Sequence, residues 1–464
     1  MTKQQTLAGS FELTGKGLHT GLNIHIKFCP AEDNYGVRIS RVDLPGKPTI
    51  KALAENVTKT ERGTVLSNKE MGVSTIEHAM AALYGMGVDN CHIEVDAPEF
   101  PILDGSAKAF VEKISEVGIV SQSHPRDEYI VTKRIEVSDP ENGSKITLLP
   151  DDKFSANVLI SFDSPILSNQ YATLNDTDDF AEEISSARTF VFVREIEKLL
   201  EHDLIKGGDL DNAIVIYDRK IPQEQFDKLA HTLGVAPIPQ AENLGYLNHR
   251  PLAFPNEPAR HKLLDLIGDL ALIGCRIRGH VIAECPGHSI NSKLTKMIRK
   301  DIAINQERAP IYDPNATPVL DVRQIKELLP HRFPMLFVDK VIELGPTSIV
   351  GIKNYSIGEP YFQGHFPEEP VVPGVFLIEA AAQIAGIMVI SQNKESGITY
   401  STYLMKVENA KFRHKVSPGD TVVFKIRLTS PIRRNTASVR GVGFVGGKLV
   451  FETDLLAQIV TSEG

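Results

Sequence analysis

The alternation of apolar and polar positions predicts two related strand pairs in the first two thirds of the chain. In residues 26–40, "IKFCPAEDNYGVRIS", an apolar strand, a turn with proline and acidic residues, and a second strand follow one another. Residues 146–161, "ITLLPDDKFSANVLIS", repeat this order. Short apolar runs bounded by turn residues are typical of strands. The repetition indicates an internal duplication.

A helical segment lies downstream of each strand pair. "STIEHAMAALYGMG" spans residues 74–87 and "PARHKLLDLIGDLALIG" spans residues 258–274. Both end in glycine, which often closes a helix. We therefore expect an α+β fold, an α/β sandwich whose two halves, residues 1–125 and 126–312, pack face to face.

The last third of the chain has a different pattern. Residues 306–322, "QERAPIYDPNATPVLDV", interrupt the periodic sequence with three prolines and place a domain boundary near residue 313. An apolar, Ala-rich helix follows within residues 364–386, and strand-like runs rich in Val, Ile, Phe and Thr end the chain. A helix that is apolar on nearly all sides is buried. For residues 313–464 we expect an antiparallel sheet wrapped round this helix.

The composition is that of an ordinary globular protein, with 42% hydrophobic and 23% charged residues. The net charge of -9 argues against general nucleic-acid binding. The N-terminus, "MTKQQTLAGSFELTG", lacks the apolar run of a signal peptide, and we identify no apolar stretch of about 20 residues, so we expect a cytoplasmic protein without a transmembrane segment. The four cysteines form no CxxC pair, which suits a reducing compartment; they are Cys29, Cys91, Cys275 and Cys285.

The second helical segment carries a candidate metal site. His261, Asp265 and Asp269 are spaced four apart, so a helix projects all three from one stripe. A histidine and an aspartate at this spacing can bind one metal ion, although the spacing is also frequent by chance. Catalytic zinc takes three protein ligands and leaves a position for water. A third ligand is therefore needed.

The first helical segment offers that ligand in His78, which follows Glu77. A glutamate beside a metal-binding histidine is well placed as a general base. Two other interpretations stay open at this point. Ser74 and Glu77 fit the S-x-x-E capping box, in which the glutamate only closes the helix start. His78 fits a buried histidine of an Ala-rich helix.

Six segments, in order over about residues 5 to 305, resemble the motif series of the zinc-dependent UDP-3-O-acyl-N-acetylglucosamine deacetylase of lipid A synthesis. They are "TGKGLHTG" (14–21), "STIEHAMAAL" (74–83), "FPILDGSA" (100–107), "SARTF" (186–190), "RHKLLDLIGDL" (260–270) and "GHSINSKL" (287–294). The resemblance implies that Zn²⁺ is held by His78, His261 and Asp265. It also implies that Glu77 takes a proton from the attacking water.

The same resemblance assigns roles to five further residues. Thr189 would donate to the developing oxyanion, and His288 would protonate the amine that leaves. Asp269 would hold the imidazolium of His288. Lys262 and Phe190 would help to bind the substrate, a UDP-linked acylated glucosamine. A solvated helix lysine is the alternative interpretation of Lys262.

One carboxylate, Glu379, lies in the middle of the apolar helix of the last third. An ionised carboxylate taken out of water is costly, so such a group is paired, protonated or functional. Glu379 and Gln383, at i and i+4, could merely hydrogen-bond each other. A histidine, a buried carboxylate and a helix N-terminus nevertheless suit proton transfer beside a thioester. His365 can take the α-proton, Glu379 can protonate the departing hydroxyl with a pKa raised by burial, and the Gly374 N–H can face the carbonyl oxygen.

Residues 318–464 resemble the 3-hydroxyacyl-(acyl-carrier-protein) dehydratase of fatty-acid synthesis. The resemblance rests on "LLPHRFPMLFVDKV" (328–341), "GHFPEEPVVPGVFLIEAAAQIAG" (364–386) and "VENAKFRHKVSPGD" (407–420). It implies the hot-dog fold and a dyad completed across a dimer, His365 from one protomer and Glu379 from the other. It also implies a homo-oligomer built on dimers, with six chains in all.

Two features of this domain leave alternatives. Glu368 and Glu369 stand where a glycine usually follows "GHFP". Four basic residues either meet an acidic acyl-carrier protein or are solvated surface charge; they are Arg413, Lys415, Arg433 and Arg434.

The two resemblances together predict a bifunctional enzyme. It combines a zinc amidohydrolase of lipid A biosynthesis with a hydro-lyase that dehydrates 3-hydroxyacyl-acyl-carrier protein in fatty acid biosynthesis. In the alternative, the last domain is a thioesterase, or a module that docks the acyl carrier and oligomerises the chain.

Overall fold

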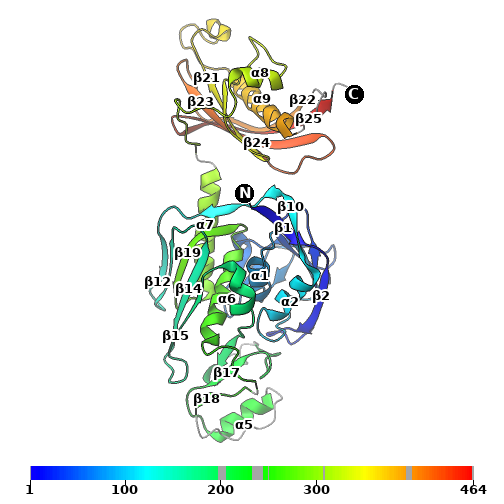
Figure 1. The fold of residues 1–464 in the computed structure, drawn as a ribbon, viewed down its shortest axis with the longest axis vertical. Coiled ribbons are helices and arrows are strands. Elements are labelled where there is room, and N and C mark those ends of the chain that lie inside the picture. Colours follow the sequence, from blue (N-terminus) through cyan, green and yellow to red (C-terminus); the bar gives the residue numbers. More distant parts are fainter. Residues whose placement is uncertain are drawn as a thin grey trace. The chain divides into compact units, whose positions relative to one another are not determined.

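Packing divides the chain into two units, Met1–Ile302 and Ala303–Gly464 (Figure 1). The computed structural model describes residues 2–196, 205–232, 244–248, 250–306, 309–392 and 400–461. The predicted domain limits at residues 125 and 313 stay predictions, since the packing division at residue 302 lies close to the second of them without defining it.

Two five-stranded paths in unit 1 share one topology. In the first sheet the order is β2 (Phe11–Lys16), β3 (Asn23–Pro30), β9 (Cys91–Val95), β4 (Val37–Arg41) and β5 (Thr49–Lys51). In the second it is β12 (Ile135–Asp139), β13 (Ser144–Leu149), β19 (Arg276–Glu284), β14 (Phe154–Ser161) and β15 (Asn169–Leu174), and β11 (Glu128–Ile130) also pairs with β19. In both, the third and fourth strands pair in parallel and the others antiparallel. The predicted duplication is confirmed.

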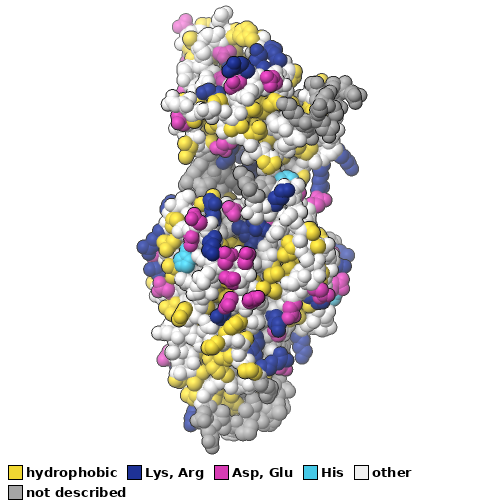
Figure 2. All heavy atoms as spheres, in the orientation of Figure 1, with side chains coloured by type: hydrophobic (Ala, Val, Ile, Leu, Met, Phe, Trp, Pro, Cys, Tyr) yellow, Lys and Arg dark blue, Asp and Glu magenta, His cyan; other side chains and the backbone are white. Residues whose placement is uncertain are grey.

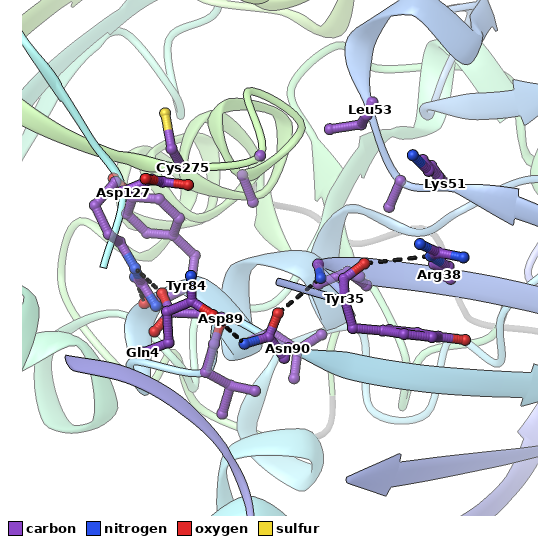
Figure 3. Close-up of a pocket in the computed structure, with 18 of the residues that line it drawn as sticks. Gln4, Tyr35, Arg38, Lys51, Leu53, Tyr84, Asp89, Asn90, Asp127 and Cys275 are labelled. Carbon is purple, nitrogen blue, oxygen red and sulfur yellow. Dashed lines mark hydrogen bonds and ion pairs between the residues drawn. The ribbon is translucent and has the colours of Figure 1, made fainter. Parts of the chain in front are cut away.

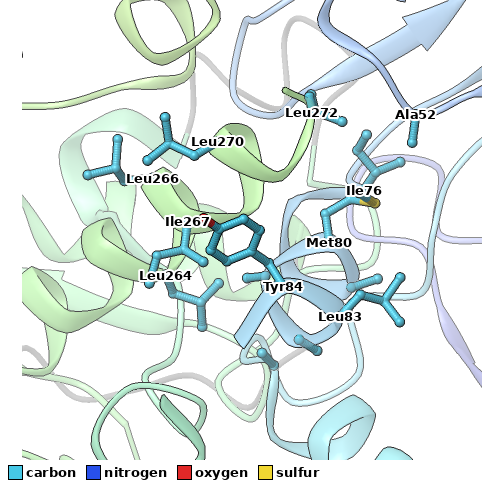
Figure 4. Packing of buried hydrophobic residues seen from close by; sticks show 14 of the residues in the cluster. Ala52, Ile76, Met80, Leu83, Tyr84, Leu264, Leu266, Ile267, Leu270 and Leu272 are labelled. Atoms are coloured by element: carbon cyan, nitrogen blue, oxygen red, sulfur yellow. The ribbon is translucent and has the colours of Figure 1, made fainter. Parts of the chain in front are cut away.

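The helices α1 (Glu77–Gly85) and α6 (Glu257–Ala271) lie between the two sheets (Figure 1). Their apolar side chains form one buried cluster, including Met80, Leu83, Leu264 and Ile267 (Figure 4). Each such side chain contributes about 1.5–3 kcal/mol through burial. The helices cross closely at Gly268, where an added Cβ would lie 2.1 Å from a backbone oxygen of α1. Only glycine permits this approach.

The remaining elements of unit 1 complete the two halves. After the third strand of each sheet comes a further helix, α2 (Lys108–Val117) or α7 (His288–Gln306), and β1 (Lys3–Leu7) pairs with β10 (Ile119–Pro125). Each half also carries an insertion just before its central helix. The first contains β6 (Val57–Lys59), β7 (Val65–Ser67) and β8 (Gly72–Val73); the second contains β16 (Phe190–Phe192), β17 (Ile214–Tyr217), α5 (Gln223–Thr232) and β18 (Gly245–Tyr246). Both insertions therefore lead into the N-terminal ends of α1 and α6.

Unit 2 is a six-stranded antiparallel sheet packed on the long helix α9 (Gly374–Gln392), as the hot-dog expectation requires. Its order is β20 (Lys340–Leu344), β21 (Ser348–Asn354), β23 (Thr421–Leu428), β24 (Thr436–Val445), β25 (Lys448–Thr461) and β22 (Tyr400–Phe412). The short helix α8 (Val322–Leu328) begins at a capping box formed by Asp321 and Gln324. The hot-dog fold and the α+β class are confirmed.

Helix α9 is long and apolar enough to cross a membrane, although no such segment was expected from the sequence. However, 61% of its apolar window is buried inside the protein. That burial is typical of the core helix of a hot-dog unit. The edge strand β22, in contrast, exposes apolar side chains: Tyr403, Leu404, Met405, Val407 and Phe412. All four cysteines are free thiols.

Candidate active sites

The start of α1 and the middle of α6 bring the predicted metal ligands together. One ligand atom each of His78, His261 and Asp265 lies within 4.8 Å of the others, and all three side chains are buried. From Asp265 Oδ1 the distances are 3.4 Å to His261 Nε2 and 3.8 Å to His78 Nε2. No other cluster of this kind occurs among the residues that the structure describes.

The surroundings of the cluster fit a metal ion. The carbonyl oxygen of Ala187 lies 3.0 Å from His261 Nδ1, so the ring donates there and presents Nε2 without its proton to the cluster. Burial lowers the pKa of His261 and lowers that of His78 to about 3, which keeps both imidazoles in the neutral form that binds metals. Burial alone would raise the pKa of Asp265, but the nearby His261, Lys262 and His288 together lower it. A buried carboxylate facing two neutral imidazoles is the donor set of zinc or iron sites.

Glu77 begins helix α1 beside His78 and is buried. Its Oε2 accepts from the backbone N–H of Thr64 at 3.2 Å, and its Oε1 lies 3.9 Å from His288 Nε2. Burial raises the pKa of Glu77 to about 7. The capping-box interpretation is wrong, because the Ser74 hydroxyl donates to the Pro98 carbonyl oxygen and no side chain caps α1.

His288 and Asp269 form the second titratable pair of the site. Asp269 Oδ2 lies 2.9 Å from His288 Nδ1 and also accepts from Asn291 Nδ2 at 2.9 Å, while the hydroxyl of Thr64 donates to Oδ1. Burial alone would lower the pKa of His288, but the charge and hydrogen bond of Asp269 outweigh it and raise the pKa to about 9. A histidine held protonated at neutral pH can act as a general acid.

The segment around Thr189 borders the same cluster. Thr189 lies in the strand-like connection to β16, where its N–H donates to Gly105 and its carbonyl accepts from Ile214. The Phe190 ring centroid lies 6.4 Å from that of His261, and Lys262 Nζ lies 5.7 Å from the Phe190 ring. Lys262 also donates to Asp265 Oδ2 at 2.9 Å, so it is not the solvated lysine of the alternative interpretation.

In unit 2 the surroundings of Glu379 differ from the expectation. Glu379 is 29% exposed rather than buried. It accepts from Gln383 Nε2 at 2.8 Å, so the i, i+4 pair that spacing alone suggested does form. Its Oε1 also lies 3.6 Å from His331 Nε2. The helix α9 is apolar, but this turn of it faces a cavity of about 150 Å³ instead of the core.

Among the described residues of one chain, no hydrogen bond or ion pair joins His365 to Glu379. His365 Nδ1 lies 2.8 Å from the Val371 carbonyl oxygen, which orients the ring and leaves Nε2 free for chemistry. Gly374 begins α9, and an added Cβ there would lie 2.7 Å from the Phe412 ring. The Phe412 ring therefore packs closely against residue 374, and a side chain at this position would clash with it.

Two of the four basic residues considered for contact with the acyl-carrier protein pair with carboxylates instead. Arg413 donates to Glu452 at 2.6 Å and Lys415 donates to Glu369. Arg433 and Arg434 are exposed. On the visible face of unit 1, basic and acidic side chains are interspersed, without a field of one sign (Figure 2).

A separate cavity of about 240 Å³ lies at the C-terminal ends of α1 and α6 (Figure 3). Tyr84 and Cys275 line it together with Asp89, Asn90 and Asp127. None of the predicted site residues lines it.

The site also contains residues that sequence reasoning missed. Thr64 touches Glu77, Asp269 and His288 at once, and His331 faces Glu379. No local pattern marks Thr64, since it lies far along the chain from Asp269. His331 is part of the segment 328–341, but no pattern in the sequence singles it out.

Comparison with known proteins covers both units. The family described as UDP-3-O-acyl N-acetylglycosamine deacetylase (LpxC) matches residues 4–229 and 240–300, and the FabA-like domain matches residues 329–454. One solved structure, the dehydratase heterocomplex ApeI:P from Xenorhabdus doucetiae, aligns with 30% of this chain and 92% of its own, at 17% identity and a TM-score of 0.27.

Full-length relatives share the two-unit order. The bifunctional enzymes LpxC/FabZ of Porphyromonas gingivalis and Bacteroides thetaiotaomicron are 58% and 57% identical over 463 residues, with 100% of each chain covered. A UDP-3-O-acyl-N-acetylglucosamine deacetylase of Myxococcus xanthus is 38% identical over 64% of this chain and 87% of its own. The chain therefore belongs to the bifunctional LpxC/FabZ enzymes, in which a metal-dependent deacetylase of lipid A biosynthesis and a dehydratase of fatty acid biosynthesis share one polypeptide.

Proposed function

We propose that unit 1 hydrolyses the N-acetyl group of UDP-3-O-(3-hydroxyacyl)-N-acetylglucosamine with zinc held by His78, His261 and Asp265. The cluster of two neutral imidazoles and one carboxylate carries the proposal. When bound, zinc supplies Lewis-acid chemistry: it polarises the acetamide carbonyl and lowers the pKa of water towards about 7. The remaining steps belong to the side chains around it.

Two of these side chains move protons. Glu77, with a pKa of about 7, takes the proton of the attacking water, because near neutral pH a sizeable fraction of it is ionised. His288, held protonated by Asp269, gives its proton to the amine as the C–N bond breaks. Thr189 donates to the oxyanion, and Lys262 and Phe190 bind the substrate beside it.

The experiment compares metal content and both activities in the full chain. A chelator abolishes deacetylation and leaves dehydration intact, because the proposed ligands all lie in unit 1. Glu77→Gln retains the metal, measured by atomic emission, but loses deacetylation. The matched control is Glu70→Gln, an exposed glutamate of the same unit, which changes neither. Loss of metal in Glu77→Gln would show that Glu77 is a ligand instead of a base.

We further propose that unit 2 dehydrates 3-hydroxyacyl-acyl-carrier protein with Glu379 as acid and the partner's His365 as base. The imidazole takes a proton from C2, the C3–O bond breaks, and Glu379 protonates the hydroxyl that leaves as water. The N–H of Gly374, at the start of α9, stabilises the charge on the thioester carbonyl oxygen. The absence of contact between His365 and Glu379 in one chain supports a dyad built from two chains.

The apolar edge strand β22 supports a dimer in which a second copy covers it. Tyr403 is 64% exposed and Met405 is 56% exposed, and an exposed apolar strand at the edge of a sheet favours pairing with another strand. By family resemblance we propose six chains in all and a cytoplasmic location. Light scattering tests the assembly; a monomer with full dehydratase activity would contradict it.

A further inference from the structure

His331 faces the proposed acid of the dehydratase site from outside helix α9. It lies in the loop between α8 and β20, and its Nε2 is 3.6 Å from Glu379 Oε1. Both side chains line the cavity of about 150 Å³, together with Gln383. The role proposed above for Glu379 does not use this histidine.

Gln383 is fixed by three hydrogen bonds, so its orientation is set by the backbone. Its Oε1 accepts from the Phe337 N–H at 2.8 Å, and its Nε2 donates to the Met335 carbonyl oxygen at 2.7 Å. The second hydrogen on Nε2 donates to Glu379 Oε1 at 2.8 Å. An amide with both ends committed cannot flip to accept from Glu379. Oε1 of Glu379 therefore permanently faces a donor.

The same loop orients His331. Arg332 holds the loop through the carbonyl oxygens of Leu329, His331 and Lys326, at 2.8, 2.7 and 3.0 Å. The Nδ1 of His331 is buried and has no hydrogen-bond partner among the described residues. A proton on Nδ1 would be a buried donor without an acceptor, which is costly. The neutral ring therefore carries its proton on Nε2, directed at Glu379.

We propose that His331 is a positioning residue that, with Gln383, saturates Oε1 of Glu379 with two donors. The acidic proton of Glu379 must then reside on Oε2, the oxygen left for the substrate. The separation of 3.6 Å is longer than a hydrogen bond, but such contacts in free enzymes are often long and tighten as charge develops. This inference rests on the proposed role of Glu379 as the acid.

The elimination step shows what this arrangement achieves. The C2–H bond breaks and its proton passes to the partner's His365, while the electron pair forms the C2=C3 double bond. The C3–O bond breaks, and the Oε2–H proton of Glu379 joins the departing oxygen to give water. Glu379 is left as a carboxylate, which the two donors on Oε1 stabilise. His331 therefore acts on the chemical step and not on substrate binding.

The test uses the full chain and three substitutions at dehydratase positions. His331→Leu removes the donor at similar volume and is expected to lower kcat about 10- to 100-fold with little change in KM, as loss of a hydrogen bond to a charged group does. His331→Gln places an amide N–H near the position of Nε2 and is expected to restore most of kcat. Glu379→Gln abolishes dehydration if Glu379 is the acid.

Two controls separate the explanations. Deacetylation by the same molecules reports that each variant chain is folded and concentrated as expected, and His414→Leu, at an exposed histidine of unit 2, keeps the wild-type kcat. Equal loss in the Leu and Gln variants, or a wild-type kcat in His331→Leu, overturns the role of His331. If His331→Leu does not fold, a kcat of His331→Gln more than about 100-fold below wild type in a normally folded chain overturns it as well. Retention of dehydration in Glu379→Gln would instead refute the proposed acid.

Discussion

Substitution of Asp269 by asparagine is expected to move the alkaline limit of deacetylation without changing the shape of the site. The pKa of His288 is about 9 because Asp269, 2.9 Å away, outweighs the effect of burial. Asparagine keeps the side-chain volume but removes the charge of Asp269, the strongest of the groups that raise the pKa of His288, so that pKa falls towards its ordinary value of 6.5. The general acid is active below its pKa and is lost as pH rises through it. The limit therefore falls from about pH 9 towards about pH 6.5.

The size of the effect follows from the two protonated fractions. At pH 8 a group with a pKa of about 9 is about 90% protonated, and a group at about 6.5 is about 3% protonated, a ratio of about 30. At pH 6 the ratio falls below about 2. The ratio of variant to wild-type kcat is therefore the quantity to measure at each pH. Metal content must be equal in the two proteins.

A ratio that is constant between pH 6 and pH 8 would refute this reasoning. Asp269 would then act by packing, or through its hydrogen bonds to Thr64 and Asn291, instead of through the charge state of His288. Dehydration by the same variant supplies an internal reference, because unit 2 contains none of these groups.

Three further predictions concern packing and assembly. Gly268→Ala should destabilise unit 1 by about 3 kcal/mol and reduce its metal content, because the added methyl group would lie 2.1 Å from a backbone oxygen of α1. An unchanged midpoint of urea unfolding would contradict the close crossing of α1 and α6. Glu257→Leu should lower the free energy of unfolding by about 3 to 5 kcal/mol, since it leaves the buried Arg188 guanidinium without the carboxylate that it contacts at 2.8 Å. The double variant Arg188→Met with Glu257→Leu should recover much of that loss of stability. We expect chains with His365→Ala and chains with Glu379→Ala to be inactive alone. After subunit exchange at equal amounts, the mixture should regain about a quarter of wild-type dehydratase activity. An exchanged mixture without activity would refute a dyad shared between two chains.

The sequence predicts the metal cluster well because two of its ligands are local. His261 and Asp265 share one helix face, so their spacing alone places them together. His78 needed the motif series, since its meeting with α6 depends on how two distant helices cross. Thr64 could not be predicted, because it reaches Asp269 only after the insertion folds over the end of α6. Contacts made by non-local packing leave no periodic signal in the sequence.

The duplication was also readable, since each strand pair keeps its turn chemistry and is followed by a glycine-closed helix, although at different distances along the chain. The environment of Glu379, in contrast, could not be predicted from the sequence. The apolar letters around it predict burial, but a helix can be apolar on all sides and still face a cavity at one turn. Whether one turn of a helix faces the core or a cavity depends on packing between distant segments, which periodicity does not encode.

The division of the ligand set between α1 and α6 has a consequence for the life of the protein in the cell. A metal ion held by the three proposed ligands would be fully coordinated only while both halves of unit 1 are docked, so its free energy of binding would add to the free energy that keeps them together. Chains that lack metal would then open more often and be degraded faster by proteases. The abundance of the deacetylase would then follow the metal supply, and the fused dehydratase would be lost with it.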